Sequence, residues 1–161
     1  MTISFTKVSL PNGWLGNMAP FSVEHNNKLW KTTEALFQSM RFDDELIKEE
    51  IRNQKSPMAA KMIAKKHAEK MSIVPMSKQD IENMRLCLEL KLICNTELIN
   101  KLLETGNELI VEDVTKRPAG ERHRFWGAAF IDGKWIGENK LGKLWMELRT
   151  KLLLGNQNVF F

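Results

Sequence analysis

The chain has 161 residues, of which 43% are hydrophobic and 27% charged, and its formal net charge is +4. This length suits one domain, residues 1–161, that is large enough to bury a core, and the composition is that of an ordinary globular protein. No apolar run approaches the roughly 20 residues of a membrane span, and the first residues lack the pattern of a signal peptide, so we expect a cytoplasmic protein with no membrane partner.

The first thirty residues predict short strands joined by turns. Residues 3–10 alternate weakly between polar and apolar side chains, as a strand does, and 11–21 are rich in Pro, Gly and Asn, which indicates an irregular loop. Residues 22–31 resemble two strands around a turn at Asn26-Asn27.

Helices are predicted to follow. Thr32 or Thr33 can cap the first of them, and a break is expected near Phe42-Asp43. Ser56-Pro57 has the residue types of a new helix start, and that helix is predicted to run to about residue 71.

Residues 78–95 fit either a strand or a helix. Alternate leucines from Leu86 to Leu92 have the period of a strand, whereas Met84, Leu88 and Leu92 lie at helical spacing. Ser77 followed by Asp80 resembles a capping box with the shorter acid, and this favours a buried helix.

The second half predicts two further helices with short strands between them. The expected elements are a helix over "ELINKLLET" capped by Asn95-Thr96 and ended by Gly106, a strand over 108–113, a hairpin over 128–137 around Asp132-Gly133, and a helix from Leu141 to about Leu154. The expected fold class is therefore mainly α, an α+β arrangement with a small β-sheet or hairpin.

Residues with metal or nucleophile chemistry are sparse. The two cysteines, Cys87 and Cys94, are too few for a disulfide framework or a metal site, and neither has a histidine neighbour in sequence. The three histidines are scattered, and there is no phosphate-cradling or dinucleotide-binding loop. We therefore expect no metal and no cofactor.

One basic segment stands out. Residues 116–124, "KRPAGERHR", carry four cations against one acid in a Pro- and Gly-containing loop that directly precedes "FWG". Two interpretations of this segment stay open. It could contact a phosphate-bearing partner, nucleic acid included, or it could be a solvated surface.

The start of the last helix raises a question. Gly137, Asn139 and Gly142 weaken a helix start unless the backbone must approach something closely. That neighbour could be another piece of the protein, to which the glycines pack the helix, or it could be a ligand.

Five fragments, in this order, resemble the NADAR family, which is also known as the YbiA-like fold. They are "LGNMAPF" (15–21), "TTEALFQSMRF" (32–42), "SPMAAK" (56–61), "LLETGNELIVE" (102–112), and "WG" (126–127) together with "GENKLGKLWMELR" (137–149). The resemblance implies a YbiA-like single domain over the chain.

The resemblance also implies an N-glycosidase that acts on ribosides. One branch of the family cleaves ribosylamino pyrimidine phosphates, which are intermediates of riboflavin synthesis, and another removes ADP-ribose from guanine. In both, water displaces a nitrogenous base from C1′ of a ribose. An oxocarbenium-like transition state needs a fixed carboxylate nearby, and the departing base needs a proton.

Carried onto this chain, the resemblance makes Glu34 the central catalytic carboxylate and Glu112 a second acid or a structural partner of the site. Trp126 would stack on the base, Asn17 and Asn139 would hydrogen-bond ribose or phosphate, and Arg41 or Arg149 would balance charge. The full set of implied substrate-binding residues is Asn17, Arg41, Trp126, Gly127, Asn139, Gly142 and Arg149.

Two positions depart from the family pattern. His123 replaces an acid three residues before the tryptophan; it can transfer protons but cannot supply a permanent negative charge. Met76 is the nearest equivalent of a family tryptophan. A protein that binds ADP-ribose or a nucleotide, or a host or nucleic-acid partner, without cleavage is therefore the alternative, and the small size and divergent motifs would suit a phage or mobile-element gene.

Overall fold

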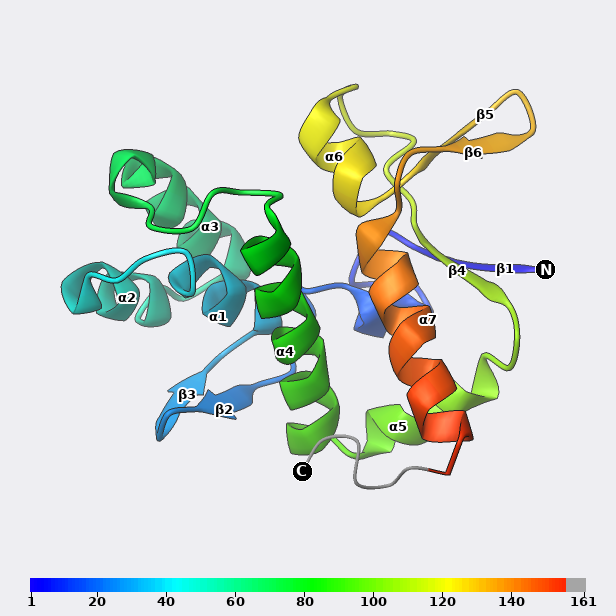
Figure 1. Ribbon diagram of the computed structural model, residues 1–161, viewed down its shortest axis with the longest axis horizontal. Coiled ribbons are helices and arrows are strands. Elements are labelled where there is room, and N and C mark those ends of the chain that lie inside the picture. The colour runs from blue at the N-terminus through cyan, green and yellow to red at the C-terminus, as the bar shows by residue number, and fades with distance from the viewer. Residues whose placement is uncertain (156–161) are drawn as a thin grey trace. The chain divides into compact units, whose positions relative to one another are not determined.

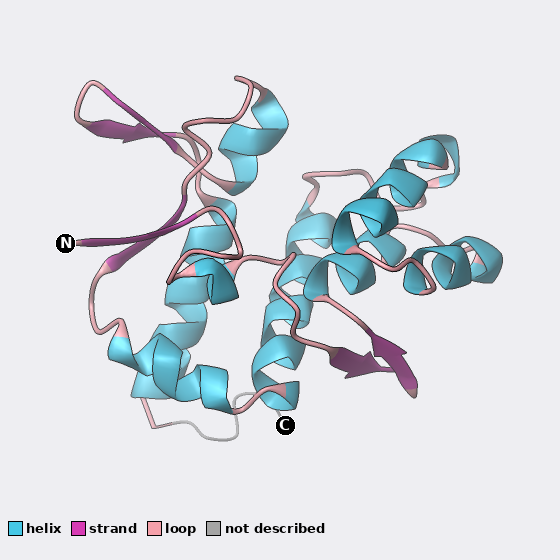
Figure 2. Ribbon diagram, turned by 180° about the vertical axis from the view of Figure 1, so that it is seen from behind, coloured by secondary structure: helices cyan, strands magenta, loops and turns pink. Residues whose placement is uncertain are grey.

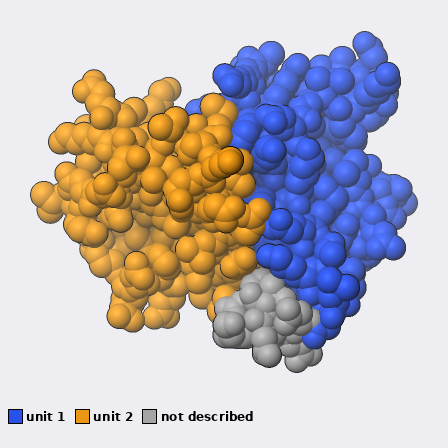
Figure 3. Space-filling view, viewed as in Figure 1, with its two compact units in different colours: residues 1–16, 96–161 blue, residues 17–95 orange. Residues whose placement is uncertain are grey.

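The computed structural model describes residues 1–155, and in that range the chain forms seven α-helices, two 3-10 helices and six short strands (Figures 1 and 2). The mainly helical class predicted from the sequence is confirmed. The chain divides into two compact units, coloured in Figure 3: unit 1 comprises Met1–Gly16 and the chain from Thr96 onward, and unit 2 comprises Asn17–Asn95. Residues 156–161 of the expected domain lie outside the described range.

Unit 2 begins with the predicted hairpin. Strand β2 (Val23–His25) pairs antiparallel with β3 (Lys28–Trp30), and the turn residues Asn26 and Asn27 have φ of 51° and 62°. A type I′ turn requires positive φ at both central residues, and asparagine tolerates it well.

Three helices follow, and each has a side-chain cap. Helix α1 (Thr33–Ser39) is capped by Thr32, α2 (Glu45–Arg52) by Asp44, and α3 (Pro57–Lys66) by Ser56. In each case the side-chain oxygen accepts a backbone N–H of the first turn, which would otherwise have no partner. Helix α3 ends five residues before the predicted position at 71, because His67 leaves helical geometry and a 3-10 turn (Ala68–Lys70) replaces it.

The ambiguous leucine-rich segment is a helix, α4 (Lys78–Cys94), which begins at the Ser77 cap. The predicted capping box is wrong in one respect. The carboxylate of Asp80 does not return to the N–H of Ser77; it accepts from the N–H of Met76 at 2.8 Å and binds the guanidinium of Arg41. A buried arginine requires a buried partner charge. Because both oxygens of Asp80 bind Arg41, the carboxylate is not used to cap the helix.

In unit 1, β1 (Thr2–Phe5) pairs in parallel with β4 (Leu109–Glu112), with Thr2 opposite Leu109. The strand predicted over 3–10 therefore ends early, at Phe5. The predicted hairpin is confirmed as β5 (Ala129–Ile131) and β6 (Lys134–Ile136), and its turn residues, Asp132 and Gly133, have φ of 50° and 77°.

The helices of unit 1 are α5 (Glu97–Glu104), α6 (Glu121–Trp126) and α7 (Lys140–Leu153), with a 3-10 turn at Gly13–Leu15. Helix α6 corrects the prediction of a loop over 116–124. Pro118 and Gly120 occupy only the start of that segment, and the helix-forming residues after them complete a short helix. Thr96 is at the cap position of α5 as predicted, but its hydroxyl makes no capping bond.

The core of unit 1 is centred on Trp145 of α7, which is fully buried. Its indole Nε1 donates to the carbonyl of Leu15 at 3.0 Å, and its ring meets Trp14 edge-on at 6.0 Å between centroids. Helix α7 also packs against β4 and α5 (Figure 1). The 3-10 turn is thereby held against α7, although the two are far apart in sequence.

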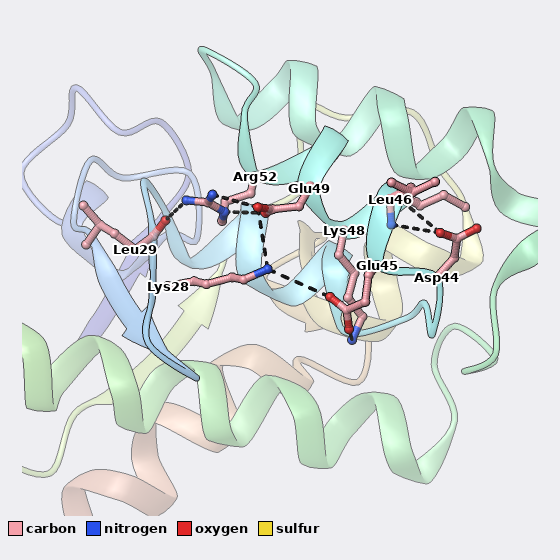
Figure 4. A network of polar contacts seen from close by, with 9 residues as sticks. Lys28, Leu29, Asp44, Glu45, Leu46, Lys48, Glu49 and Arg52 are labelled. Carbon is pink, nitrogen blue, oxygen red and sulfur yellow. Dashed lines mark hydrogen bonds and ion pairs between the residues drawn. The ribbon is translucent and has the colours of Figure 1, made fainter.

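A network of charges links the β2–β3 hairpin to α2 on the surface of unit 2 (Figure 4). The Nζ of Lys28 lies 3.6 Å from Glu49 and 4.0 Å from Glu45, while Arg52 donates to both carboxylate oxygens of Glu49 and to the carbonyl of Leu29. The hydrogen bonds from Arg52 lower the pKa of Glu49 from 4.5 to about 2.

This shift predicts a pH-dependent contribution to stability. Because the pKa of Glu49 is depressed in the folded protein, its contribution is present above about pH 4.5 and is lost as the pH falls toward 2. We expect the wild type to melt at most a few degrees above Glu49→Gln at pH 6, since the pair lies at the surface and is only half-buried, and the two to converge near pH 2. Thermal unfolding followed by circular dichroism at both pH values measures this; a pH-independent difference contradicts it.

Candidate functional site

Unit 2 buries a connected chain of four polar side chains. The amide Nε2 of Gln38 donates to Oε1 of Glu34 at 2.8 Å, and Nη1 of Arg41 donates to Oε1 of Gln38 at 3.3 Å. The Nε and Nη2 of Arg41 donate to the two oxygens of Asp80 at 2.9 and 2.8 Å. Positions 34 and 38 share one face of α1 because they are four residues apart. Arg41 lies in the turn directly after α1, and Asp80 lies in the first turn of α4.

The cluster is buried but retains one net negative charge. Glu34, Gln38 and Arg41 are 8%, 6% and 8% exposed, and Asp80 is fully buried. The two-pronged pair of Arg41 with Asp80 has the strong geometry of an arginine–carboxylate contact. Two carboxylates and one guanidinium leave the charge of Glu34 uncompensated within the cluster. Its second oxygen, Oε2, has no hydrogen-bond partner within residues 1–155.

Asn17 lies directly beside Glu34. Its backbone carbonyl accepts the N–H of Glu34 at 3.0 Å, and its amide Nδ2 donates to the sulfur of Met84 at 3.1 Å. The amide Oδ1 of Asn17 is buried without a hydrogen-bond partner among the described residues. A buried unpaired acceptor is energetically costly.

Two further titratable groups lie on the same buried face of α4. Burial, together with the nearby carboxylates of Glu34 and Asp80, raises the pKa of the Cys87 thiol, so the group stays protonated and is a poor nucleophile. Burial lowers the pKa of Lys91 to about 7, and its Nζ lies 5.4 Å from the centroid of the Phe21 ring.

The side-chain amide of Asn139, in unit 1, hydrogen-bonds the backbone of strand β4. Its amide Oδ1 accepts the N–H of Glu112 at 3.1 Å and its Nδ2 donates to the carbonyl of Ile110 at 2.8 Å, so both ends of the amide hold β4. Its left-handed φ of 52° places the side chain there, just before α7 begins. The amide therefore has a structural role in unit 1, and its predicted contact with ribose or phosphate stays a prediction.

The glycines around α7 answer the question raised by its sequence. A Cβ at Gly142 would lie 2.2 Å from the carbonyl oxygen of Ile110, and one at Gly137, where φ is +143°, would lie 2.5 Å from that of Gly127. Gly127 is itself tightly packed, since its Cβ would lie 2.5 Å from the carbonyl oxygen of Glu112. The close neighbour of Gly142 is thus the protein's own strand β4, and its predicted part in substrate binding stays a prediction.

The remaining predicted residues of unit 1 have mixed environments. Trp126 is 9% exposed and meets Phe125 edge-on at 5.0 Å between ring centroids. His123 is half-buried, with its Nδ1 2.9 Å from the carbonyl oxygen of Pro118, and Glu112 is half-buried at the end of β4. The stacking role of Trp126 and the acid–base roles of His123 and Glu112 stay predictions.

The two arginines predicted to balance charge are both buried. Nη1 of Arg149 donates to Oγ1 of Thr105 at 2.9 Å, and burial lowers the pKa of Arg149. Arg41 is engaged by Asp80 and Gln38, and its guanidinium lies 4.7 Å from the centroid of the Phe37 ring. Arg41 is therefore part of the carboxylate cluster itself, and its predicted contact with substrate stays a prediction.

Sequence reasoning missed Gln38 and Asp80 as members of this cluster. The spacing of Glu34 and Gln38, four residues apart on one helical face, was a usable signal for Gln38. Asp80 had no comparable signal, because its partner Arg41 lies 39 residues away in the turn after α1 and its own sequence context is that of an ordinary cap.

The predicted residues divide between the two units. Asn17, Glu34 and Arg41 belong to unit 2, and the others belong to unit 1. Nowhere in residues 1–155 do three or more His, Cys, Asp or Glu side chains gather so as to hold a metal ion. Over the same residues, none of the helices combines the length and apolar character that crossing a membrane requires.

Comparison with known proteins decides the family. The sequence profile of the NADAR domain matches residues 4–153. The chain belongs to the NADAR family. It is 32% identical to N-glycosidase YbiA of Escherichia coli over 152 residues, which cover 94% of this chain and 89% of that protein. The solution structure of E. coli YbiA matches this NADAR fold with a TM-score of 0.76 at 30% identity, covering 96% of this chain and 88% of the other.

A more distant relative of this NADAR chain is the riboflavin biosynthesis protein VVA0006 of Vibrio vulnificus. It is 25% identical over 146 residues, which cover 88% of this chain but only 36% of the Vibrio protein. The NADAR chain therefore corresponds to one part of that longer protein.

Proposed function

We propose that this NADAR protein is an N-glycosidase that hydrolyses the bond between a nitrogenous base and C1′ of a phosphorylated riboside. The observation that carries the proposal is the buried carboxylate of Glu34, which keeps its negative charge uncompensated within its cluster and has Oε2 free of any hydrogen bond within the described chain. The name of the E. coli relative as an N-glycosidase supports the same class.

The chemistry fits that carboxylate. As the C1′–N bond lengthens, positive charge develops on C1′ and the ring oxygen of the ribose, and a fixed anion in a dry site stabilises it strongly. Water then adds through its oxygen to C1′. One of its protons is transferred to a base, for which Glu34 Oε2 is the candidate, and the departing nitrogen takes up a proton. The products are the free base and the ribose phosphate.

Asn17 suits substrate recognition in the same unit. Its Oδ1 is an acceptor only, so it is matched by a hydroxyl or amino group of the substrate. We infer that Asn17 contacts a ribose hydroxyl or the exocyclic amine of the base.

Two substrate classes fit this reaction. The first is a ribosylamino pyrimidine phosphate, which the name of the Vibrio relative as a riboflavin biosynthesis protein favours. The second is ADP-ribose linked to guanine, which the resemblance to the other branch of the NADAR family favours.

A non-catalytic protein that binds ADP-ribose or a nucleotide is the second candidate function. The specific observation that favours it is His123, because this histidine stands where the family pattern has an acid and cannot supply a permanent negative charge.

A release assay separates these functions. Purified protein is incubated with a ribosylamino pyrimidine phosphate, with an oligonucleotide carrying ADP-ribosylated guanine, and with NAD, and freed base and sugar are detected by mass spectrometry. Release from one substrate establishes the glycosidase and names its class. The outcome that contradicts it is no release from any of the three while ADP-ribose raises the melting temperature, which is the result expected of a binding protein.

A further inference from the structure

The amide of Gln38 can adopt only one orientation. Its Oε1 accepts from Nη1 of Arg41 at 3.3 Å, and a guanidinium can only donate. Its Nε2 donates to Oε1 of Glu34 at 2.8 Å, and an ionised carboxylate can only accept. Turning the amide over would set oxygen against carboxylate and NH₂ against guanidinium, so that two hydrogen bonds would be replaced by two repulsions.

We propose that Gln38 is a positioning residue, locked by the Arg41–Asp80 pair, which fixes the side chain of Glu34 so that Oε2 meets the reacting centre. This inference rests on the proposed function and deepens it. Gln38 holds Oε1 and leaves Oε2 without a partner in residues 1–155. The carboxylate is therefore presented through one defined oxygen.

The guanidinium of Arg41 contacts Gln38, Asp80 and Phe37. Both oxygens of Asp80 accept from it, at 2.9 and 2.8 Å, and the Phe37 ring centroid lies 4.7 Å from its central carbon. Asp80 is fixed in turn by the N–H of Met76, at 2.8 Å, and is fully buried. Asp80 therefore fixes Arg41, Arg41 fixes the amide of Gln38, and Gln38 fixes the carboxylate of Glu34; we call this sequence the order of action.

The same arrangement controls charge. Only the side chain of Gln38 separates the cation of Arg41 from Glu34. Without Asp80, this cation would offset the negative charge that a cationic transition state requires. With Asp80 bound in a two-pronged contact, Arg41 orients the amide while the cluster keeps one negative charge. The Arg41–Asp80 pair thus orients the amide of Gln38 without neutralising the charge of Glu34.

Gln38→Met tests the positioning role, because methionine retains the length of the side chain and removes both amide groups. We expect kcat to fall roughly 10- to 100-fold while KM changes less than about twofold, since misplacing a reacting group by about 1 Å has an effect of that size. The matched control is Gln79→Met, at another glutamine whose Nε2 donates to a side chain four residues on, Oδ1 of Asn83 at 2.9 Å. It should leave both constants unchanged.

A double-mutant cycle tests the order of action. Arg41→Met with Asp80→Leu removes both charges of the pair, a change that folded proteins often tolerate. We expect this pair to lower kcat in the wild type but to have little further effect in Gln38→Met, because both changes act on Glu34 through the same amide. Independent, multiplicative losses of kcat overturn the proposed order of action.

A crystal structure of Gln38→Met makes the test independent of turnover. We expect the side chain of Glu34 to leave its wild-type rotamer or to become spread over several. If Glu34 keeps its position, the positioning role is overturned even when the protein is active. If Glu34 moves but no variant and no wild type releases a base, the positioning role stands and the proposed function fails instead.

Discussion

Replacing Glu34 with glutamine should lower base release by about 1,000-fold or more while the protein folds normally. The substitution removes the negative charge but preserves the shape of the side chain, and the amide oxygen can still accept the Nε2 of Gln38 that Oε1 accepts in the wild type. Only the electrostatic contribution and the basicity of Oε2 are lost. The loss should therefore appear in kcat, measured by mass spectrometry of the released base, with a nearly unchanged KM.

The control for this experiment is Glu97→Gln. Glu97 also lies in the first turn of a helix, α5, but is exposed, so its substitution should leave kcat unchanged. Circular dichroism and the melting temperature of both variants report on folding. A Glu34→Gln protein with wild-type turnover would show that the carboxylate carries no transition-state charge, and the proposed mechanism would fail.

The elements that sequence reasoning placed well are those determined by local interactions. The Thr32 and Ser56 caps, and the two hairpin turns with positive φ, depend on residues within about four positions of each other. Side-chain capping and left-handed turn conformations are properties of such short segments. The same holds for Glu34 and Gln38, whose contact follows from helical spacing alone.

Contacts between distant segments were beyond the reach of the sequence. Asp80 has the context of a capping residue, and only the folded chain brings it to Arg41, 39 residues away. Asn139 has the residue type of a ligand contact, yet its amide is used by the backbone of β4. In both cases a polar side chain satisfies a buried group elsewhere in its unit, a demand that is visible only once burial is known.

The largest effect on stability is expected for Gly142→Ala. In an ordinary helix this change is favourable by about 1 kcal/mol, because glycine loses more conformational entropy on folding. Here the new Cβ would lie 2.2 Å from the carbonyl oxygen of Ile110 and 2.5 Å from Nδ2 of Asn139, and the first of these is backbone that cannot rotate away. Helix α7 would have to move away from β4, which would break the two hydrogen bonds between the Asn139 amide and the backbone of β4.

We therefore expect Gly142→Ala to lower the free energy of unfolding by about 3 kcal/mol or more, which corresponds to a melting temperature roughly 6 to 12 °C lower for a chain of this size. Gly120→Ala is the matched control, since its Cβ would meet nothing closer than 4.0 Å, and it should be nearly neutral. Chemical denaturation of both variants measures the difference. A neutral or stabilised Gly142→Ala would mean that the backbone of α7 need not approach β4 so closely, and a ligand would again have to be considered as the reason for this glycine.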